Sequence, residues 1–300
     1  MVMSEKIAEV QDIKPINVVT WKDKLEAYKK RPLSLFLLIA VTLSAGITVA
    51  VLGALIIYIL ANGIMNLTPE LFAWKYTTEN VSMLPAIINT VLMTALSLLI
   101  AVPIGICSAI YLVEYAKRGN KLVNVVRITT ETLSGIPSIV YGLFGYLMFV
   151  IAFGWGLSFF GGALTLSIMV LPTIMRTTEE ALLSVPDSYR EGSFGLGAGK
   201  LRTVFRIVLP SAVPGILAGV ILAIGRIVGE TAALIYTAGT VADIPSSVMS
   251  SGRTLAVHMY NLASEGLYMD QAYATAVILL VLVVGINTLS GVVAKRLTKA

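Results

Sequence analysis

The chain has 300 residues, of which 57% are hydrophobic and only 13% are charged, and its mean hydropathy is +0.86. About 25% charged residues is usual for soluble domains, so the composition excludes a soluble globular protein and indicates an integral membrane protein. The net charge of +5 does not indicate nucleic-acid binding, because the basic residues are spread over short loops between apolar runs.

Uncharged runs long enough to cross a bilayer follow a polar N-terminal segment, residues 1–32. A spanning helix needs about 20 apolar residues. The run 132–175 is long enough for two spans, with a turn expected at 153–156. The other four spans are expected in residues 33–61, 81–113, 207–225 and 273–293. We therefore expect an all-α integral membrane protein with a six-span domain at 33–294 and a short tail at 295–300.

The lysines and arginines divide the loops into two classes. All but Lys75, Arg226 and Arg253 lie in stretches that fall on one side of the membrane if six spans alternate. Because positive loops stay in the cytoplasm, both termini are predicted to be cytoplasmic and residues 243–271 to lie outside. In this outer region, the spacing of Leu255, Met259 and Leu262 fits a short interfacial or re-entrant helix, and an ordinary outer loop fits equally well.

The predicted cytoplasmic loop at 177–210 contains a motif with fixed spacing. Its anchor residues are Glu191, Gly192, Ser193, Gly197, Ile207, Leu209 and Pro210. They resemble the EAA loop of ABC importer permeases, E-A-A-x3-G-x9-I-x-L-P, with small residues in place of both alanines. The resemblance implies that these residues dock on an ATPase and that the loop contains the cytoplasmic coupling helix.

The local sequence of this loop predicts two short helices joined by a turn. Asp187 or Ser188 is expected to cap a helix that begins near Tyr189. Gly197 and Gly199 permit the turn, and a second helix is expected at 200–207.

Three longer segments, 129–146, 171–200 and 223–239, resemble the A-type permease subunit of phosphate-specific ABC importers, which are binding-protein-dependent transport permeases. The resemblance implies the type I ABC importer permease fold in a prokaryotic plasma membrane and a translocation pathway for phosphate shared with a second, C-type permease. It also implies two ATP-binding subunits, an extracytoplasmic phosphate-binding protein and no cofactor. Ala233 departs from the family pattern, which most often has proline there.

Two charged residues stand out in the fifth apolar region. Arg226 and Glu230 are four residues apart, so on one helix they would share a face and could pair. Ionisable groups in a span are costly and indicate function, and the arginine fork suits an oxyanion. We expect Arg226 to serve the anion pathway and Glu230 to orient it; the alternative is a self-neutralising structural pair.

Other function classes find less support in the sequence. The chain contains no Walker A motif, so ATP hydrolysis is expected in partner subunits and the chain itself is not expected to be an enzyme. A single cysteine and a single histidine give no metal cluster. The remaining alternatives are a permease for phosphonate, molybdate, sulfate or another small solute, and a secondary transporter, for which Glu230 would be the only coupling carboxylate in a span.

Overall fold

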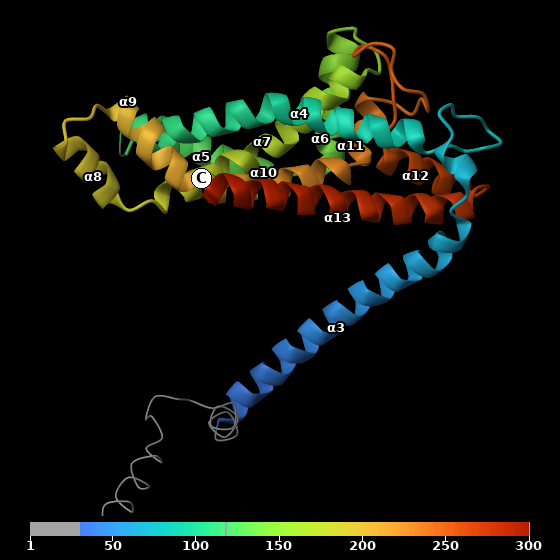
Figure 1. Ribbon diagram of the computed structural model, residues 1–300, viewed down its shortest axis with the longest axis horizontal. Helices are drawn as coiled ribbons and strands as arrows, with labels where there is room; N and C mark the ends of the chain where they lie inside the picture. Colours follow the sequence, from blue (N-terminus) through green and yellow to red (C-terminus); the bar gives the residue numbers. More distant parts are fainter. Residues whose placement is uncertain (1–30, 118, 300) are drawn as a thin grey trace, which may run out of the picture. The chain divides into compact units, whose positions relative to one another are not determined.

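The computed structural model describes residues 31–117 and 119–299 (Figure 1). Most of the N-terminal segment 1–32 therefore lies outside the described residues. The chain divides into two compact units, residues 1–58 and 59–300, and each is described by itself.

In the first unit the described residues belong to one helix. Helix α3 (Pro32–Gly63) starts there and ends in the second unit. It contains no charged residue, and its apolar side chains are exposed on all sides. A helix that is apolar all round suits a lipid environment, so α3 has the character of a membrane span.

The second unit is built from helices of very different length. The short 3₁₀ helices η2 (Ile64–Asn66) and η3 (Pro69–Phe72) precede the main bundle. The long helices are α4 (Leu84–Ile110), α7 (Phe159–Leu183), α10 (Leu209–Val228) and α13 (Met269–Lys299). Shorter ones are η4 (Tyr111–Tyr115), α5 (Lys121–Ser134), α6 (Ser138–Gly145), η5 (Tyr146–Ala152), α8 (Asp187–Gly195), α9 (Lys200–Thr203), η6 (Val204–Val208), α11 (Ala232–Thr237) and α12 (Leu255–Glu265).

Among the described residues, five helices are long and apolar enough to cross a membrane, and a bent pair of helices brings the number to six. The six-span expectation is confirmed in this form. The bent pair is α5 with α6 and η5, which meet at 106°. Pro137 lacks a backbone donor and restricts the residue before it, which explains the break. The start of α5 differs from the prediction: its charged residues are typical of a loop, and the structure has a helix there.

The turn expected at 153–156 is present between η5 and α7. Gly154 and Gly156 both adopt positive φ angles, 67° and 66°, a conformation that glycine adopts at little cost. The ring of Trp155 stacks on Phe149 at a centroid distance of 5.6 Å. This turn reverses the chain so that α7 returns through the bundle.

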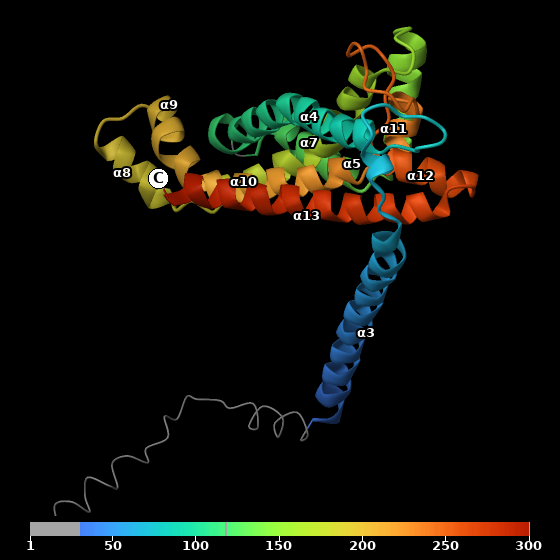
Figure 2. The ribbon, with the colours of Figure 1, turned by 45° about the vertical axis from the view of Figure 1, so that its right-hand side comes forward.

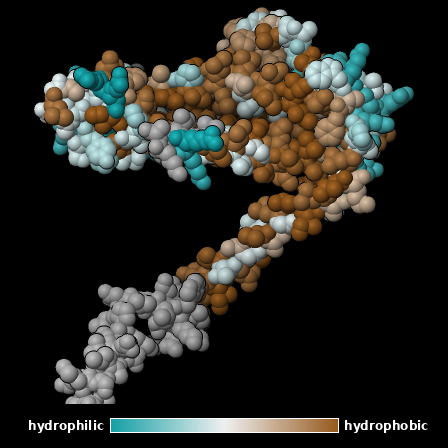
Figure 3. All heavy atoms as spheres, in the orientation of Figure 1, coloured by the Kyte–Doolittle hydropathy of each residue, from teal (hydrophilic) through white to brown (hydrophobic). Residues whose placement is uncertain are grey.

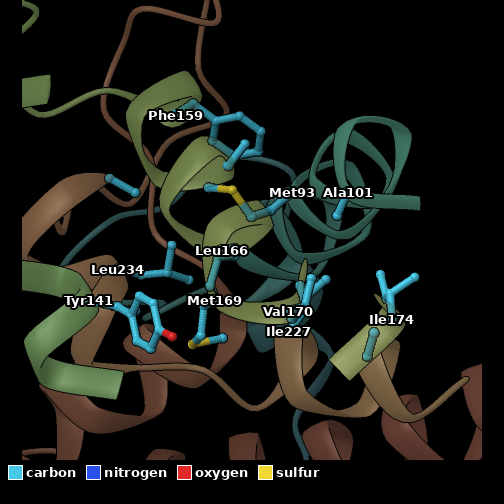
Figure 4. Packing of buried hydrophobic residues seen from close by; sticks show 14 residues of the cluster. Met93, Ala101, Tyr141, Phe159, Leu166, Met169, Val170, Ile174, Ile227 and Leu234 are labelled. Carbon is cyan, nitrogen blue, oxygen red and sulfur yellow. The ribbon is translucent and has the colours of Figure 1, made fainter. Parts of the chain in front are cut away.

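Helix α7 lies at the centre of the second unit. It packs against α4, α5, α6, α10 and α11, and Figure 4 shows its residues Leu166, Met169 and Val170 among side chains from the surrounding helices. Small residues permit these close approaches: a Cβ on Gly105 of α4 would lie 2.7 Å from Ile174 of α7. A Cβ on Gly219 of α10 would overlap the hydroxyl of Thr177.

Polar and apolar surfaces are separated along the second unit. Figure 3 shows hydrophobic residues over the middle of the long helices and hydrophilic residues gathered toward the two ends. Figures 1 and 2 both place α8 and α9 at one end and α12 at the other. This arrangement is the one expected of a bundle whose middle faces lipid.

Part of the outer region 243–271 and most of the C-terminal tail 295–300 are helical. Residues 255–265 of the outer region form α12, with Leu255 and Leu262 fully buried, so the helical alternative is the correct one. Helix α13 continues to Lys299 and includes most of the expected tail. The boundaries of the six-span domain stay a prediction.

Candidate functional site

The loop with the EAA-like motif folds as two helices joined by a turn. Helix α8 begins at Asp187, and Pro186 occupies the position before it. The expected side-chain cap is wrong: Asp187 is the first helical residue, and its carboxylate accepts a hydrogen bond from Arg190 at 3.2 Å. The second expected helix is present as α9 and η6, which continue directly into α10.

Gly197 makes the turn between the two helices. Its φ of 80° is left-handed, and its N–H donates to Phe194 at 2.9 Å. Gly199 has an ordinary extended conformation, so it does not supply the turn as expected. The hydroxyl oxygens of Ser193 and Thr203 lie 2.8 Å apart and join α8 to α9. The two helices therefore form one small unit at the end of the bundle.

The predicted docking residues are divided between the surface and the interior of this unit. Glu191, Gly192, Gly197 and Pro210 are exposed, Ile207 and Leu209 are partly buried, and Ser193 is buried. A cavity of about 420 Å³ lies beside Gly192 and is also lined by Leu196, Arg202 and Arg206. The side chain of Leu196 is 91% exposed. Leu196 is an exposed apolar residue just before the turn glycine, a position that the motif alone does not mark.

Arg190 connects this unit to the rest of the bundle. Its Nε and Nη2 donate to Oε1 of Glu114 at 3.1 and 2.8 Å. It also donates to the backbone carbonyls of Leu182 and Val185 at 2.9 and 2.8 Å, where α7 ends. The side chains of Arg190 and Glu114 are only 14% and 8% exposed. This buried contact joins α8 to η4 and to the last turn of α7. It could not be predicted from the sequence, because Arg190 and Glu114 are far apart in the chain.

Arg226 lies in the last turn of α10, and Glu230 lies beyond the end of this helix. The expected pairing on one helix face is therefore wrong, because α10 ends at Val228. Oε1 of Glu230 instead accepts a hydrogen bond from the N–H of Ala233 at 3.1 Å, at the start of α11. Proline has no N–H, so the proline of the family pattern at position 233 could not make this hydrogen bond. The alanine of this chain permits it.

Arg226 lines a cavity of about 520 Å³ between α7, α10 and α13. The cavity is also lined by Thr173, Leu222, Gly225 and Asn287. No carboxylate of the described residues lies within ion-pair distance of Arg226. A partly buried guanidinium without a counter-charge beside a cavity can bind an anion.

A second buried basic cluster lies at the end of the unit that carries α12. His258 is fully buried, and its ring meets that of Tyr76 edge-on at 6.2 Å. The guanidinium of Arg253 lies 4.7 Å from the centre of the Tyr76 ring. Burial, with the nearby charge of Arg253, lowers the pKa of His258 to about 3. Among the described residues, no group of three or more histidine, cysteine or acidic residues could hold a metal ion.

The chain is similar in sequence to transport permeases. Residues 101–299 match the family described as binding-protein-dependent transport system inner membrane component. The probable ABC transporter permease protein YqgI of Bacillus subtilis is 36% identical over 76% of this chain and 82% of its own length. Phosphate transport system permease protein PstA 1 of Mycobacterium tuberculosis is 40% identical over 51% of this chain and 50% of its length. PstA of Pasteurella multocida is 41% identical over 60% and 64%.

Solved structures share the fold at low sequence identity. The inward-facing MetNI methionine ABC transporter gives a TM-score of 0.55 at 20% identity, covering 72% of this chain and 94% of that chain. A bacterial ABC transporter involved in alginate import gives 0.57 at 18% identity, covering 88% and 99%. The expected fold, that of type I ABC importer permeases, is confirmed.

Proposed function

Because the chain belongs to the binding-protein-dependent transport system inner membrane component family, we propose that it is the permease subunit of an ATP-driven importer of inorganic phosphate. It is a multi-pass inner-membrane protein, and permeases of this family work with a second permease, an ATPase and a substrate-binding protein. In the proposed complex the second permease is a C-type subunit, two ATP-binding subunits hydrolyse ATP, and the extracytoplasmic partner binds phosphate. The relatives named phosphate permeases support this choice of substrate.

The observation that carries the proposal is the position of Arg226. Arg226 lines a cavity between three long helices, and no carboxylate of the described residues pairs with it. An anion that crosses a region of low dielectric without compensation would meet a large energetic barrier. Arg226 offsets that charge and donates several hydrogen bonds to the oxyanion.

Glu230 serves the pathway in this proposal by fixing the backbone next to Arg226. It is 8% exposed, and its hydrogen bond to Ala233 sets where α11 begins after α10 has ended. Loss of that bond would let the segment after Arg226 move. The role differs from that of a direct ionic partner, and it predicts that Glu230→Gln is milder than Glu230→Leu because glutamine keeps an acceptor.

The test is radiolabelled phosphate uptake by the assembled complex in proteoliposomes. Arg226→Gln is expected to lose nearly all uptake, and Arg226→Lys to keep a part, because lysine retains the charge without the planar fork. Both variants should copurify with the ATPase, since α8 and α9 lie at one end of the bundle, away from α12 and from the end of α10 (Figure 1). Full uptake by an assembled Arg226→Gln complex would leave Arg226 only a structural role.

A further inference from the structure

We propose that Asn287 and Thr173 complete the Arg226 cavity as a binding site for a tetrahedral oxyanion that still carries a proton. The inference rests on the proposed function, because it takes Arg226 as the anion-binding group. It goes further by naming the class of anion that the permease itself accepts. It also separates phosphate from sulfate and molybdate, two of the substrates that the sequence leaves open.

The three polar residues come from three different helices. Thr173 lies on α7, Arg226 on α10 and Asn287 on α13, and all three line the same cavity of about 520 Å³. Asn287 follows the start of α13 at Met269 by about 27 Å and precedes Lys295 by about 12 Å, at a rise of 1.5 Å per residue. Thr173 follows the start of α7 by about 21 Å on the same basis. The cavity therefore lies well inside the spans, where polar side chains are costly and usually functional.

The amide of Asn287 lies against Gly225, the residue next to Arg226. A Cβ on Gly225 would lie 3.9 Å from both Nδ2 and Oδ1 of Asn287. Oδ1 is buried and has no hydrogen-bond partner among the described residues. A buried acceptor without a partner is costly, and native proteins seldom retain one without a reason. Oδ1 is covered in the chain without a ligand, so the amide must turn toward the cavity before an anion bound there can supply the missing donor from its own O–H.

Thr173 adds a second polar group to the lining of the cavity. Its backbone carbonyl accepts from Thr177, but within the described part of the chain its own hydroxyl makes no hydrogen bond. A threonine hydroxyl can both donate and accept. The cavity therefore offers hydrogen-bond donors from Arg226. It also offers two groups, the Asn287 amide and the Thr173 hydroxyl, that can accept a hydrogen bond from a protonated oxygen of the anion.

This set of groups matches one class of oxyanion. Arginine only donates, so it binds the unprotonated oxygens. Inorganic phosphate near neutral pH keeps one or two protons, and each P–O–H needs an acceptor. Sulfate and molybdate carry no proton at this pH, so an acceptor would face one of their lone pairs and repel it. Phosphonate and arsenate keep a proton and satisfy the same groups. A site built with acceptors rejects a ligand that lacks the matching donor.

The first experiment measures phosphate uptake by the complete complex in proteoliposomes. Asn287→Leu keeps the approximate volume and removes both polar atoms, and we expect uptake to fall at least tenfold. Thr173→Val should fall severalfold, whereas Thr173→Ser should stay near the wild-type rate. Gly285→Ala on α13 is the matched control: Gly285 lies two residues from Asn287, does not line the cavity, and a Cβ there would meet no atom within 4 Å, so uptake should not change.

The second experiment tests the proton directly through the pH dependence of uptake. Asn287→Asp keeps an acceptor but adds a negative charge, so it should favour the singly charged, doubly protonated phosphate. The ratio of uptake at pH 6 to uptake at pH 8 should rise at least threefold relative to the wild-type complex. A variant that only loosens the packing would lower both rates without changing their ratio.

The outcomes separate this inference from the proposed function. If Arg226→Gln is inactive while assembled Asn287→Leu transports at the wild-type rate, Arg226 keeps its role and the Asn287 inference is wrong. An unchanged pH ratio in Asn287→Asp also overturns it. If Arg226→Gln itself transports normally, the proposed pathway fails first.

Discussion

The buried histidine of α12 makes stability depend on pH. The pKa of His258 is about 3 in the folded chain, against about 6.5 for an exposed histidine. Between these values the unfolded chain binds more protons, so stability falls as the pH falls below 6.5. At pH 5 the loss is about 2 kcal/mol. Thermal unfolding of the purified complex between pH 7.5 and 5 measures it.

His258→Phe is the control for this prediction. Phenylalanine keeps an aromatic ring against Tyr76 but has no proton to gain. Its melting temperature should therefore depend less on pH than that of the wild-type complex over this range. Equal slopes for the two proteins would mean that other groups cause the acid sensitivity.

Single residues were the least predictable part of the site. Arg226 could be found from the sequence because a charge inside an apolar run is costly wherever the helix ends. Its relation to Glu230 could not, because the spacing of four residues implies a shared face only if the helix continues, and α10 ends at Val228. Asn287 gave no signal, since one amide in a span becomes informative only when the cavity beside Arg226 is known.

At the scale of elements, we predict that the surface of α8 docks on the ATPase. Gly192 is exposed, lines the cavity beside Leu196, and a Cβ added to it would meet no atom within 4 Å. Gly192→Ala should therefore fold and transport as the wild type does. Gly192→Trp should fold but block entry of α8 into a partner groove. Copurification of the ATPase and phosphate uptake should both fall at least tenfold in this variant.

Gly192 is a better position for this test than Gly197. Gly197 has a φ of 80°, so any side chain there strains the turn as well as blocking the surface. A loss of docking in a Gly197 variant would be ambiguous. Normal ATPase copurification by Gly192→Trp would remove α8 from the docking surface.

The contact between Arg190 and Glu114 should couple α8 to the spans. Removing one partner of a buried pair costs about 3–5 kcal/mol, because the other charge is left unpaired. We expect Arg190→Met and Glu114→Leu each to reduce uptake while the ATPase still copurifies. The double variant should be less impaired than the sum of the two, since no buried charge is left unpaired: Asp187, the other partner of Arg190, is 74% exposed to solvent. Strictly additive losses in uptake and thermal stability would show that the two residues act separately.

Elements with a strong local signal were predictable, and those that depend on tertiary contacts were not. The turn at 153–156 and the left-handed Gly197 follow from glycine chemistry. The spans follow from the length of their apolar runs. Helix α5 was not predicted, because charged residues in its sequence are typical of a loop between spans. In the fold one of them, Arg127, forms an ion pair with Glu179 of α7 at 2.5 Å.

At the scale of the whole molecule, the segment predicted to bind the ATPase and the predicted outer region lie at opposite ends of the second unit. Figures 1 and 2 place α8 and α9 at one end of the long helices and α12 at the other, and the cavity at Arg226 lies between helices that run from end to end. We expect motion imposed on α8 to reach this cavity, because Arg190 binds Glu114 of η4 and the carbonyl of Leu182 in α7. An ATPase on one face and a substrate-binding protein on the other would suit this layout.

That layout requires the two ends to face opposite sides of the membrane. In a Cys107→Ala background, which removes the only cysteine, we expect single cysteines replacing Ser4 and Ser188 to react only from the cytoplasm. A cysteine replacing Ser247 should react only from outside. Ser188 and Ser247 are both exposed, so an impermeant thiol reagent applied to intact cells and to inverted vesicles distinguishes the sides. The distribution of lysines and arginines predicts that the loop with α8 is cytoplasmic. Reaction of Ser188→Cys and Ser247→Cys from the same side would therefore contradict both the alternation of six spans and the assignment of α8 to the ATPase.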